Sequence, residues 1–318
     1  MAKTSSDKIP DMMFVRPKVI PEEVIEAARR WVEIHNSHLF LLICYNRPEQ
    51  VNLHRSFVDY VYRHREQFKD IKTLDILLDH FGGSVEAAYQ LITLFRNHCK
   101  KLRIFIPDYA KSAATLLALG ADEIWMGEVA EMGPLDAQIP DPREPDEYIS
   151  ALDEFRAVDY LRTHGFEILN EFVRVLNRTT SLRMKDKIQI ASEHTTRLMQ
   201  GLYQNVDPLH FGGSHRAVEM SVEYGKRVMR RHRYQDWSTG CIDTLLRKLA
   251  WDYPSHSFVI DIEEAKELGL DVNLLTGETD DLAHTILVGL EEAAGFIAVP
   301  KPTMSLNVIT SEAAEDDD

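Results

Sequence analysis

In the first 135 residues of the chain, continuous apolar runs alternate with segments in which apolar residues recur at helical spacing. Four short apolar runs are typical of strands buried on both faces; they are 39–45, 74–78, 102–107 and 123–126. In 21–34 and 85–95, apolar residues recur every three or four positions, which predicts amphipathic helices. Strands that alternate with helices in this way predict right-handed crossovers and a parallel sheet. The expected fold class is therefore α/β, with a parallel-sheet core of βαβ units.

The second half of the chain is predicted to be mostly helical. A loop with three prolines and several acidic residues, 140–146, separates it from the first half. Helices are expected at 147–176, 182–203, 215–233 and 239–250, followed by a short strand at 258–261 and helices at 263–268 and 282–294. We expect an N-terminal arm at 1–20, a single α/β domain at 21–300 with a helical insertion at about 147–250, and a disordered acidic tail at 301–318.

The charge of the chain narrows the classes of partner. Its 318 residues hold 36 Lys and Arg against 51 Asp and Glu, a formal net charge of −15, and five of the carboxylates lie in the last eight residues. This acidity argues against binding of nucleic acid and against docking on anionic lipid. No run approaches the roughly 20 apolar residues of a membrane span, and no leader pattern is found, which predicts a cytoplasmic protein. The three scattered cysteines and the histidines predict no metal site, disulfide or cofactor.

Two turns after buried strands carry the candidate chemistry. The run 74–78 leads into Asp79-His80-Phe81-Gly82-Gly83-Ser84 and then a helix. Paired glycines let the backbone bend sharply and expose amide N–H groups that can hold an anion. A glycine turn followed by a helix-capping serine is also common without any function, so both interpretations stay open here. His80 is assigned no role beyond packing.

The next crossover adds a candidate nucleophile. The run 102–107 leads into Asp108-Tyr109-Ala110-Lys111-Ser112-Ala113-Ala114-Thr115, where Ser112 precedes an apolar helix. Ser112 can be an ordinary helix cap, but the carboxyl end of a parallel strand is also where ligands bind in open α/β sheets. The amides of Ala113 and of the glycines would then face one point, as an oxyanion hole requires.

These residues resemble those of a known family. The order Gly-Gly-Ser-Val, helix, strand, Ala-x-Ser-Ala, helix, Ala-Asp-Glu-Ile and Gly-Pro-Leu-Asp-x-Gln resembles the Clp-fold serine peptidases, in particular the serine dehydrogenase proteinase family, which is related to signal-peptide peptidase A and the Clp proteolytic subunit. The resemblance covers about 38–140, and 255–270 resembles the closing strand and helix of that fold. It implies a Clp/crotonase-like core, peptide hydrolysis and a homo-oligomer acting on a protein or peptide substrate.

By position, the resemblance implies roles for four residues. Ser112 falls on the family nucleophile, Gly82 and Gly83 on the oxyanion loop, and Ala113 on the residue whose amide completes the oxyanion hole. In this mechanism the Ser112 hydroxyl attacks a peptide carbonyl and water later releases the acyl group. Asp136, in the Gly-Pro-Leu-Asp turn, matches a family signature as a possible orienting group, or ties the turn by hydrogen bonds.

The general base does not follow from the resemblance. The Clp subunit takes its histidine from a segment that corresponds to 131–136, which holds no histidine, and signal-peptide peptidase A uses a lysine, but none lies between Lys111 and Lys185. His256 is a candidate base, or a surface histidine. Asp252 would orient His256, or be a solvated carboxylate. Lys111 adjoins the nucleophile but its side chain should diverge from it, and Lys185 and Lys187 are expected on a solvated helix face.

Two other functions stay open at this point. A crotonase-like enzyme would use the same amides to polarise an acyl-CoA thioester, although the glycine turn lacks the Lys or Arg that would bind the phosphates. A non-catalytic scaffold or peptide-binding protein would keep the pocket without a base. The preferred hypothesis is a serine peptidase.

Overall fold

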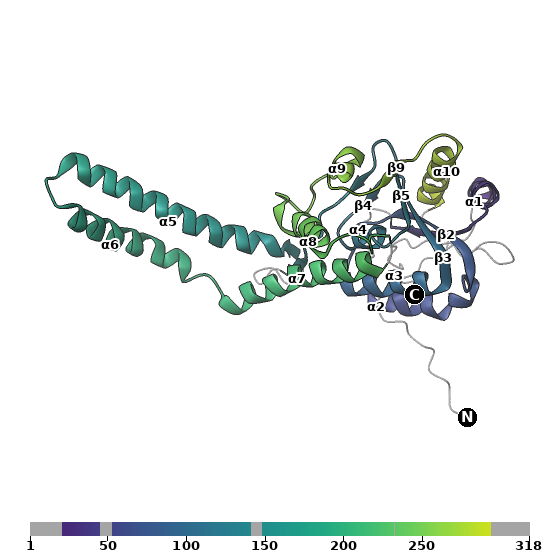
Figure 1. The fold of residues 1–318 in the computed structure, drawn as a ribbon, viewed down its shortest axis with the longest axis horizontal. Helices are drawn as coiled ribbons and strands as arrows, with labels where there is room; N and C mark the ends of the chain where they lie inside the picture. Colours follow the sequence, from purple (N-terminus) through teal and green to yellow (C-terminus); the bar gives the residue numbers. More distant parts are fainter. Residues whose placement is uncertain (1–20, 45–52, 141–147, 232, 294–318) are drawn as a thin grey trace, which may run out of the picture. The chain divides into compact units, whose positions relative to one another are not determined.

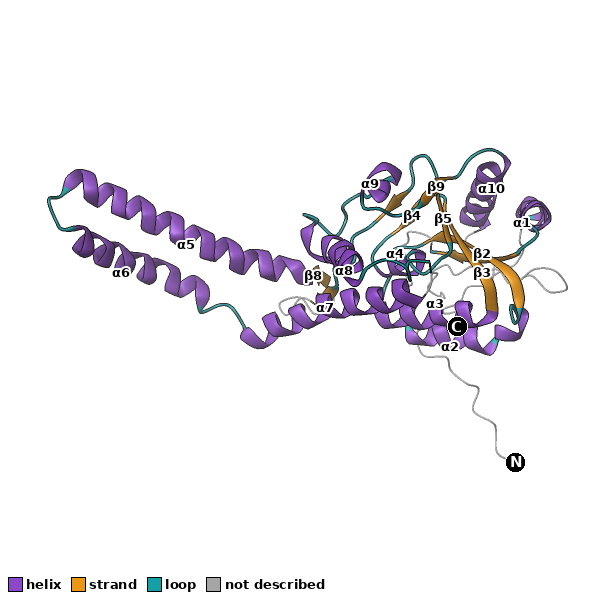
Figure 2. Ribbon diagram, viewed as in Figure 1, coloured by secondary structure: helices purple, strands orange, loops and turns teal. Residues whose placement is uncertain are grey.

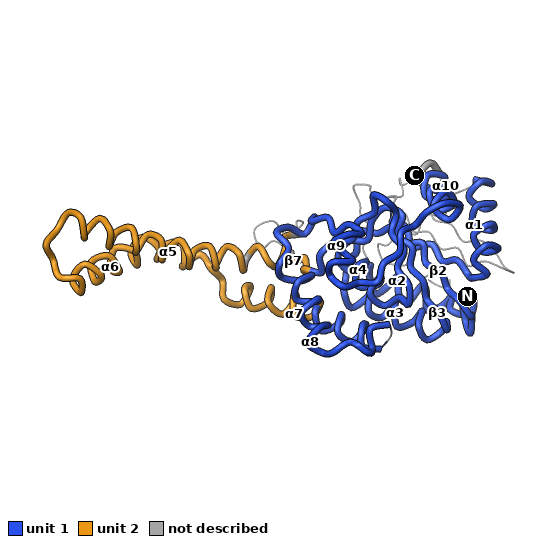
Figure 3. The backbone as a smooth tube through the Cα atoms, turned by 45° about the horizontal axis from the view of Figure 1, so that its top comes forward, with its two compact units in different colours: residues 1–135, 222–318 blue, residues 136–221 orange. Residues whose placement is uncertain are grey.

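The computed structural model describes residues 21–44, 53–140, 148–231 and 233–293 (Figure 1). The chain divides into two compact units, which Figure 3 distinguishes by colour. Unit 1 comprises residues 1–135 and 222–318, and unit 2 comprises 136–221. Among the described residues, no helix is both long enough and apolar enough to cross a membrane.

Unit 1 contains a five-stranded parallel sheet. The strands are β1 (His38–Ile43), β2 (Ile71–Asp79), β3 (Cys99–Ile106), β5 (Glu123–Met126) and β9 (Val272–Leu274), in the order β1-β2-β3-β5-β9. Each neighbouring pair is parallel. The α/β class and the parallel-sheet core expected from the sequence are therefore confirmed, and the first four strands fall on the four apolar runs.

The fifth strand is not the one that the sequence predicts. In the predicted strand 258–261, only Ile260 pairs, through an isolated antiparallel bridge with Met132. Val259 is 49% exposed, so this short apolar stretch is not covered on both faces as a central strand would be. Val272–Leu274 instead closes the sheet beside β5.

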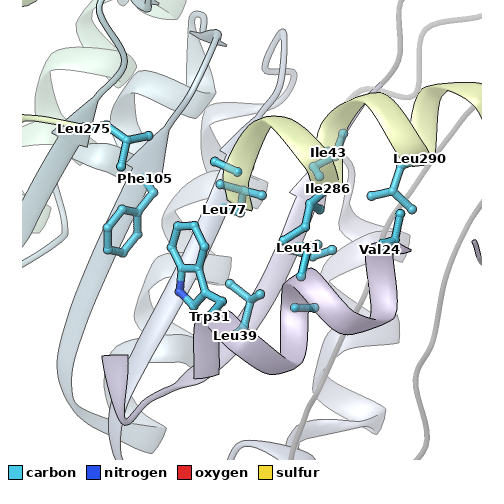
Figure 4. Close-up of a cluster of buried hydrophobic side chains, with 13 residues drawn as sticks. Val24, Trp31, Leu39, Leu41, Ile43, Leu77, Phe105, Leu275, Ile286 and Leu290 are labelled. Carbon is cyan, nitrogen blue, oxygen red and sulfur yellow. The ribbon is translucent and has the colours of Figure 1, made fainter. Parts of the chain in front are cut away.

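Helices cover both faces of the sheet in unit 1. α1 (Glu22–His35) and α10 (Glu278–Ala293) pack side by side on one face, where their apolar residues meet alternate side chains of β1, Leu39, Leu41 and Ile43 (Figure 4). Phe40, which points the other way, packs edge-on against Phe95 of α3 (Val85–His98), with ring centroids 4.9 Å apart. The helix α2 (Arg55–Arg63), which the sequence pattern did not reveal, contacts α3.

A buried ion pair joins two neighbouring strands of the sheet, and a hydrogen bond ties it to α1. Asp75 of β2 is fully buried and accepts hydrogen bonds from Trp31 of α1 (2.9 Å) and from Ser37 (2.5 Å). Arg103 of β3 donates to both oxygens of the same carboxylate, at 2.6 and 2.8 Å. Every oxygen of this carboxylate thus has a charge-assisted or neutral partner, as burial of a charge requires.

A second, smaller set of strands continues from the end of β2. β4 (Tyr109–Ala110) pairs with β6 (Glu131–Met132) in parallel, His80 bridges to Ala110, and Ile260 bridges to Met132. The other elements of unit 1 are η1 (Arg65–Gln67), α4 (Ala113–Ala118), α8 (Thr239–Arg247), η2 (Lys248–Asp252) and α9 (Ile262–Glu267). The glycine turn, the Ser112 turn and the 258–260 segment therefore belong to one continuous set of backbone pairings.

The described residues of unit 2 are mostly helical and include one short antiparallel pair of strands. Figure 2 colours helices and strands differently. It contains β7 (Gln138–Pro140), β8 (Tyr148–Ser150), α5 (Ala151–Thr179) and α6 (Met184–Tyr203), and α7 (Pro208–Arg231) begins in unit 2 and ends in unit 1. Residues 222–250, the last part of the predicted insertion at about 147–250, are assigned to unit 1, where Val228 lies beside Gly120 and Leu246 lies beside Gly225. The expected arm 1–20 and tail 301–318, and most of the proline loop, lie outside the described residues.

Candidate active site

The glycine loop begins where β2 ends. His80 is 1% exposed, and its Nδ1 atom accepts a hydrogen bond from the N–H of Gly82 at 2.8 Å. Burial lowers the pKa of His80 to about 3, so the imidazole is neutral at physiological pH. The role of His80 is therefore more specific than packing: it holds the first glycine of the loop through its backbone.

Neither glycine of the loop has room for a side chain. Gly82 and Gly83 have φ angles of +109° and +139°. A Cβ on Gly82 would lie 2.6 Å from the carbonyl oxygen of Lys111 and 2.9 Å from the amide nitrogen of Ala113, and a Cβ on Gly83 would lie 2.3 Å from the nitrogen of Leu53. The glycines thus let the loop contact the Ser112 turn on one side and the chain at Leu53 on the other.

The bridge with Leu53 sets the direction of the glycine amides. The N–H of Leu53 donates to Gly82 O at 2.7 Å, and Leu53 O accepts from the N–H of Ser84 at 2.9 Å. In a parallel bridge of this kind, the N–H of the residue between, Gly83, points away from Leu53. Within the described part of the chain, the N–H of Gly83 has no hydrogen-bond acceptor. Leu53 had no signal in the local sequence, because its partner lies 30 residues away.

Ser112 occupies a strained turn between β4 and α4. Its φ and ψ angles are 51° and −120°, an unusual conformation for a residue with a side chain. It is 9% exposed, and its hydroxyl makes no capping hydrogen bond to α4. By contrast, Ser84 does cap α3, accepting from the N–H of Ala87 at 3.1 Å. The interpretation of Ser112 as an ordinary helix cap is therefore wrong, and a serine at a sharp strand-to-helix turn whose hydroxyl is not used as a cap is typical of a nucleophile.

The amide of Ala113 lies on the same side as the glycine loop. The would-be Cβ of Gly82 is 3.0 Å from the Cβ of Ser112 and 2.9 Å from Ala113 N, so the loop, the serine and this amide are in direct contact. As the first residue of α4, Ala113 has no carbonyl partner for its N–H inside the helix. The hydroxyl of Ser112 and the amides of Gly83 and Ala113 are the combination that acyl transfer to serine uses.

Thr115 of α4 fixes the backbone on either side of this turn by hydrogen bonds. It is fully buried, and its Oγ1 lies 2.7 Å from Ala110 O and 2.8 Å from Gly133 O, while the N–H of Gly133 lies 3.2 Å away. One side chain of α4 thus bridges the backbone of β4 to the residue after β6. Its threonine identity gave no signal in an otherwise apolar helix.

Lys111 is engaged in an ion pair. Its Nζ lies 2.8 Å from Glu131 Oε1 and donates to the carbonyl oxygen of Phe258 at 3.5 Å. The side chain lies over Gly133, where a Cβ would be 2.7 Å from Lys111 Cδ. An ammonium that is paired with a carboxylate has no lone pair to accept a proton, so this geometry does not favour Lys111 as the base.

The segment 255–260, which carries His256, lies next to this lysine. His256 is half-buried in the turn Ser255–Phe258, and Asp252 is exposed at the end of η2. The contact between Phe258 O and Lys111 Nζ brings the segment to the residue before Ser112. The Met132–Ile260 bridge fixes the same segment to β6. These contacts place the segment that carries His256 in the neighbourhood of the serine turn.

The remaining candidates lie in unit 2. Asp136 is buried and accepts a hydrogen bond from Ser150 Oγ at 2.6 Å, which joins the two ends of the β7–β8 segment. Lys185 is exposed on α6. Lys187 is not on a solvated face as expected: it is 6% exposed and donates to Asn177 Oδ1 of α5 at 2.9 Å. Throughout the described ranges, no group of three or more His, Cys, Asp or Glu side chains is placed to hold a metal ion.

A serine in a strained turn that contacts a glycine loop and the amide of Ala113 is the arrangement that serine hydrolases use. Residues 58–152 match the family model described as ClpP-like SDH-type serine proteinase. The matched segment contains Gly82, Gly83, Ser112 and Ala113. The resemblance to this family that the sequence predicts is therefore confirmed over this segment, which is 95 of the 318 residues.

Two curated relatives come from the archaeon Methanocaldococcus jannaschii, and both are described as uncharacterized proteins. One is 26% identical over 202 residues, which cover 64% of this chain and 54% of the relative. The other is 41% identical over 66 residues, which cover 21% of this chain and 23% of the relative. The chain thus spans about half the length of the first relative and less of the second.

Two similar solved structures are mutants of the 1510-N membrane-bound stomatin-specific protease. One, in complex with a substrate peptide, has a TM-score of 0.41 and 12% identity and covers 87% of this chain and 92% of that chain. The other has a TM-score of 0.29 and 16% identity, and the match covers 48% of this chain and 67% of that chain.

Proposed function

We propose that this chain is a serine peptidase that hydrolyses peptide bonds with Ser112 as its nucleophile. The observation that carries the proposal is the contact between the strained Ser112 turn and a glycine loop whose Gly83 amide points away from Leu53. The Ser112 hydroxyl attacks the carbonyl carbon of the peptide bond. The amides of Gly83 and Ala113 stabilise the resulting oxyanion, and loss of one such donor typically costs about 2.7–4 kcal/mol of barrier.

The reaction needs a base for the proton of Ser112. We propose His256 for this role, because its segment contacts the residue adjacent to Ser112 and because a neutral imidazole can accept a proton. The protonated base then gives the proton to the leaving amine, which leaves an acyl-enzyme. Water attacks the acyl-enzyme with the same base accepting its proton, and Ser112 is regenerated. Asp252, four residues before His256, is proposed to orient the imidazole.

The strained serine also separates this proposal from the two other functions. A thioester enzyme of the crotonase type would use the amides alone and would leave the conformation of Ser112 unexplained. A scaffold that only binds peptides needs no serine in an unfavourable conformation, which costs about 1–3 kcal/mol to maintain. We further propose that the peptidase is a cytoplasmic homo-oligomer, as the sequence suggests.

The proposal is tested by peptide cleavage with matched serine variants. Wild-type chain, Ser112→Ala and Ser84→Ala are incubated with a mixture of unstructured peptides, and products are identified by mass spectrometry. Ser84→Ala is the control, because Ser84 follows the same glycine loop but caps α3. We expect cleavage by wild type and Ser84→Ala and none by Ser112→Ala. Equal cleavage by wild type and Ser112→Ala would assign the activity to another site or to a contaminant.

A further inference from the structure

The turn between α5 and α6 has a charge opposite to that of the rest of the chain. We call residues 171–190 the hairpin tip; it consists of the last turns of α5, the connection 180–183 and the first turns of α6. The hairpin tip holds five basic and two acidic residues, a net charge of 5 − 2 = +3. The remaining residues hold 31 basic and 49 acidic side chains, a net charge of −18. The overall acidity therefore conceals one basic segment.

The cations of the hairpin tip are oriented largely to solvent. Arg174 Nη1 lies 3.9 Å from Glu171 Oε2. The side chain of Arg183 is 87% exposed, and its Nε lies 3.2 Å from Asp186 Oδ2. Lys187 is buried against α5, where its Nζ donates to Asn177 Oδ1, so it contributes to the net charge of the hairpin tip but not to its exposed cations. Arg178 and Lys185 are exposed, and in the described residues neither forms an ion pair with a carboxylate.

Apolar side chains are interleaved with these cations. Five of them are between 44% and 52% exposed: Val175, Leu182, Met184, Ile188 and Ile190. Leu182 and Met184 flank Arg183 at the connection between the helices, and Lys185 follows directly. A two-helix hairpin has only one face between its helices in which to bury apolar residues, so these side chains are left on its outer surface.

We propose that the hairpin tip docks on an anionic lipid surface. Clusters of four to eight Lys and Arg side chains on amphipathic helices are attracted to acidic headgroups, and neighbouring apolar side chains insert below them. The long stems of Lys and Arg allow their charges to stay at the headgroup level.

A lipid surface fits the hairpin tip better than an acidic protein does. Apolar and basic side chains alternate from Leu182 to Lys185, so a partner must accept apolar and basic groups side by side. A bilayer interface does so without a shaped pocket, whereas a protein would need a groove complementary to each side chain. This inference does not depend on the proposed peptidase activity, because none of its residues belongs to the serine site.

The experiment is co-sedimentation of the full chain with vesicles of phosphatidylcholine that contain phosphatidylglycerol, against vesicles of phosphatidylcholine alone. We expect binding only to the anionic vesicles, and its loss in high salt. The double substitution Arg178→Gln and Lys185→Gln should weaken binding roughly thirtyfold. The matched control is Arg162→Gln with Arg197→Gln, which removes the same charge from the same helices outside the hairpin tip.

The apolar contribution is tested in the same way. Leu182→Ser with Met184→Ser should weaken binding, whereas Leu198→Ser with Leu202→Ser, at similarly exposed positions of α6, should not. Circular dichroism checks that each variant keeps its helices. Absence of binding to anionic vesicles, or equal binding by tip and control variants, would overturn the proposal. If instead the tip variants lose self-association or capture of an acidic polypeptide without any vesicle binding, the surface is a protein interface and the proposal is wrong.

Discussion

The Nδ1 atom of His80 accepts a hydrogen bond from the backbone N–H of Gly82 at 2.8 Å. This bond commits the amide of Gly82 to structure, whereas the amide of Gly83 points away from Leu53 and has no acceptor among the described residues. It also requires an unprotonated Nδ1, so the oxyanion loop is held in place by a neutral, buried histidine.

The first prediction concerns the pH dependence of stability. Burial lowers the pKa of His80 to about 3, whereas a histidine in an unfolded chain titrates near 6.5. Between these values the unfolded state binds more protons than the folded state. The stability that neutral His80 provides is therefore complete above about pH 6.5 and is lost as the pH falls towards 3, at about 1.4 kcal/mol per pH unit.

Urea unfolding of wild type and His80→Asn at a series of pH values measures this contribution. Asparagine keeps an oxygen acceptor for the N–H of Gly82 but does not titrate. We expect the free energy of unfolding of the variant to depend less steeply on pH between 4 and 6. Parallel curves for the two proteins would show that His80 is already protonated in the fold.

The second prediction concerns the glycine loop. Gly82→Ala places a Cβ 2.6 Å from Lys111 O at a φ of +109°, so the loop must move away from the serine turn. A displacement of about 1 Å at a catalytic group costs on the order of 10²-fold in rate, and we expect kcat/KM to fall by at least that factor. Gly201→Ala, in α6 with nothing within 4 Å of the new Cβ, is the control and should keep the wild-type rate.

The third prediction separates the two candidate bases. Because Lys111 is held by Glu131 at 2.8 Å, Lys111→Gln should retain most of the activity, apart from the effect of leaving Glu131 unpaired. His256→Ala should lower kcat/KM by about 10²–10⁴-fold, the usual contribution of a general base. Steady-state kinetics of both variants on one peptide decide the matter. A large loss in Lys111→Gln together with full activity in His256→Ala would exchange the two roles.

The fourth prediction concerns the core. Asp75→Asn removes the charge that Arg103 binds at 2.6 and 2.8 Å, and it leaves a largely buried guanidinium unpaired. Removal of one partner of a buried ion pair typically costs about 3–5 kcal/mol of stability. Asp159→Asn, which removes an exposed partner of Arg162 on α5, should cost less than about 1 kcal/mol. Chemical denaturation of both variants provides the comparison.

The sequence predicts those parts of the molecule that depend on neighbouring residues. The first four strands follow from apolar runs, and the glycines and Ser112 follow from turns directly after those strands. The parts that the sequence does not predict depend on contacts between residues that are distant in sequence. Leu53 bridges to Gly83, Lys111 lies over Gly133, and β9 pairs with β5 across about 150 residues. No local pattern encodes these pairings.

The role of Ser112 likewise depends on more than its sequence neighbours. Serine before an apolar helix has the same sequence signal whether it caps the helix or acts as a nucleophile. The two roles differ in backbone conformation, and a φ of 51° with no capping hydrogen bond distinguishes Ser112 from Ser84. Its position 3.0 Å from the would-be Cβ of Gly82 then depends on the packing of two crossovers.

The most direct test of the central claim is reaction of the full chain with a fluorophosphonate, followed by digestion and mass spectrometry to locate the adduct. We expect one adduct, on the hydroxyl of Ser112, which is present in wild type and in Ser84→Ala and absent in Ser112→Ala. An adduct on another residue, or no adduct in a preparation that cleaves peptides, would contradict the assignment of Ser112 as the nucleophile.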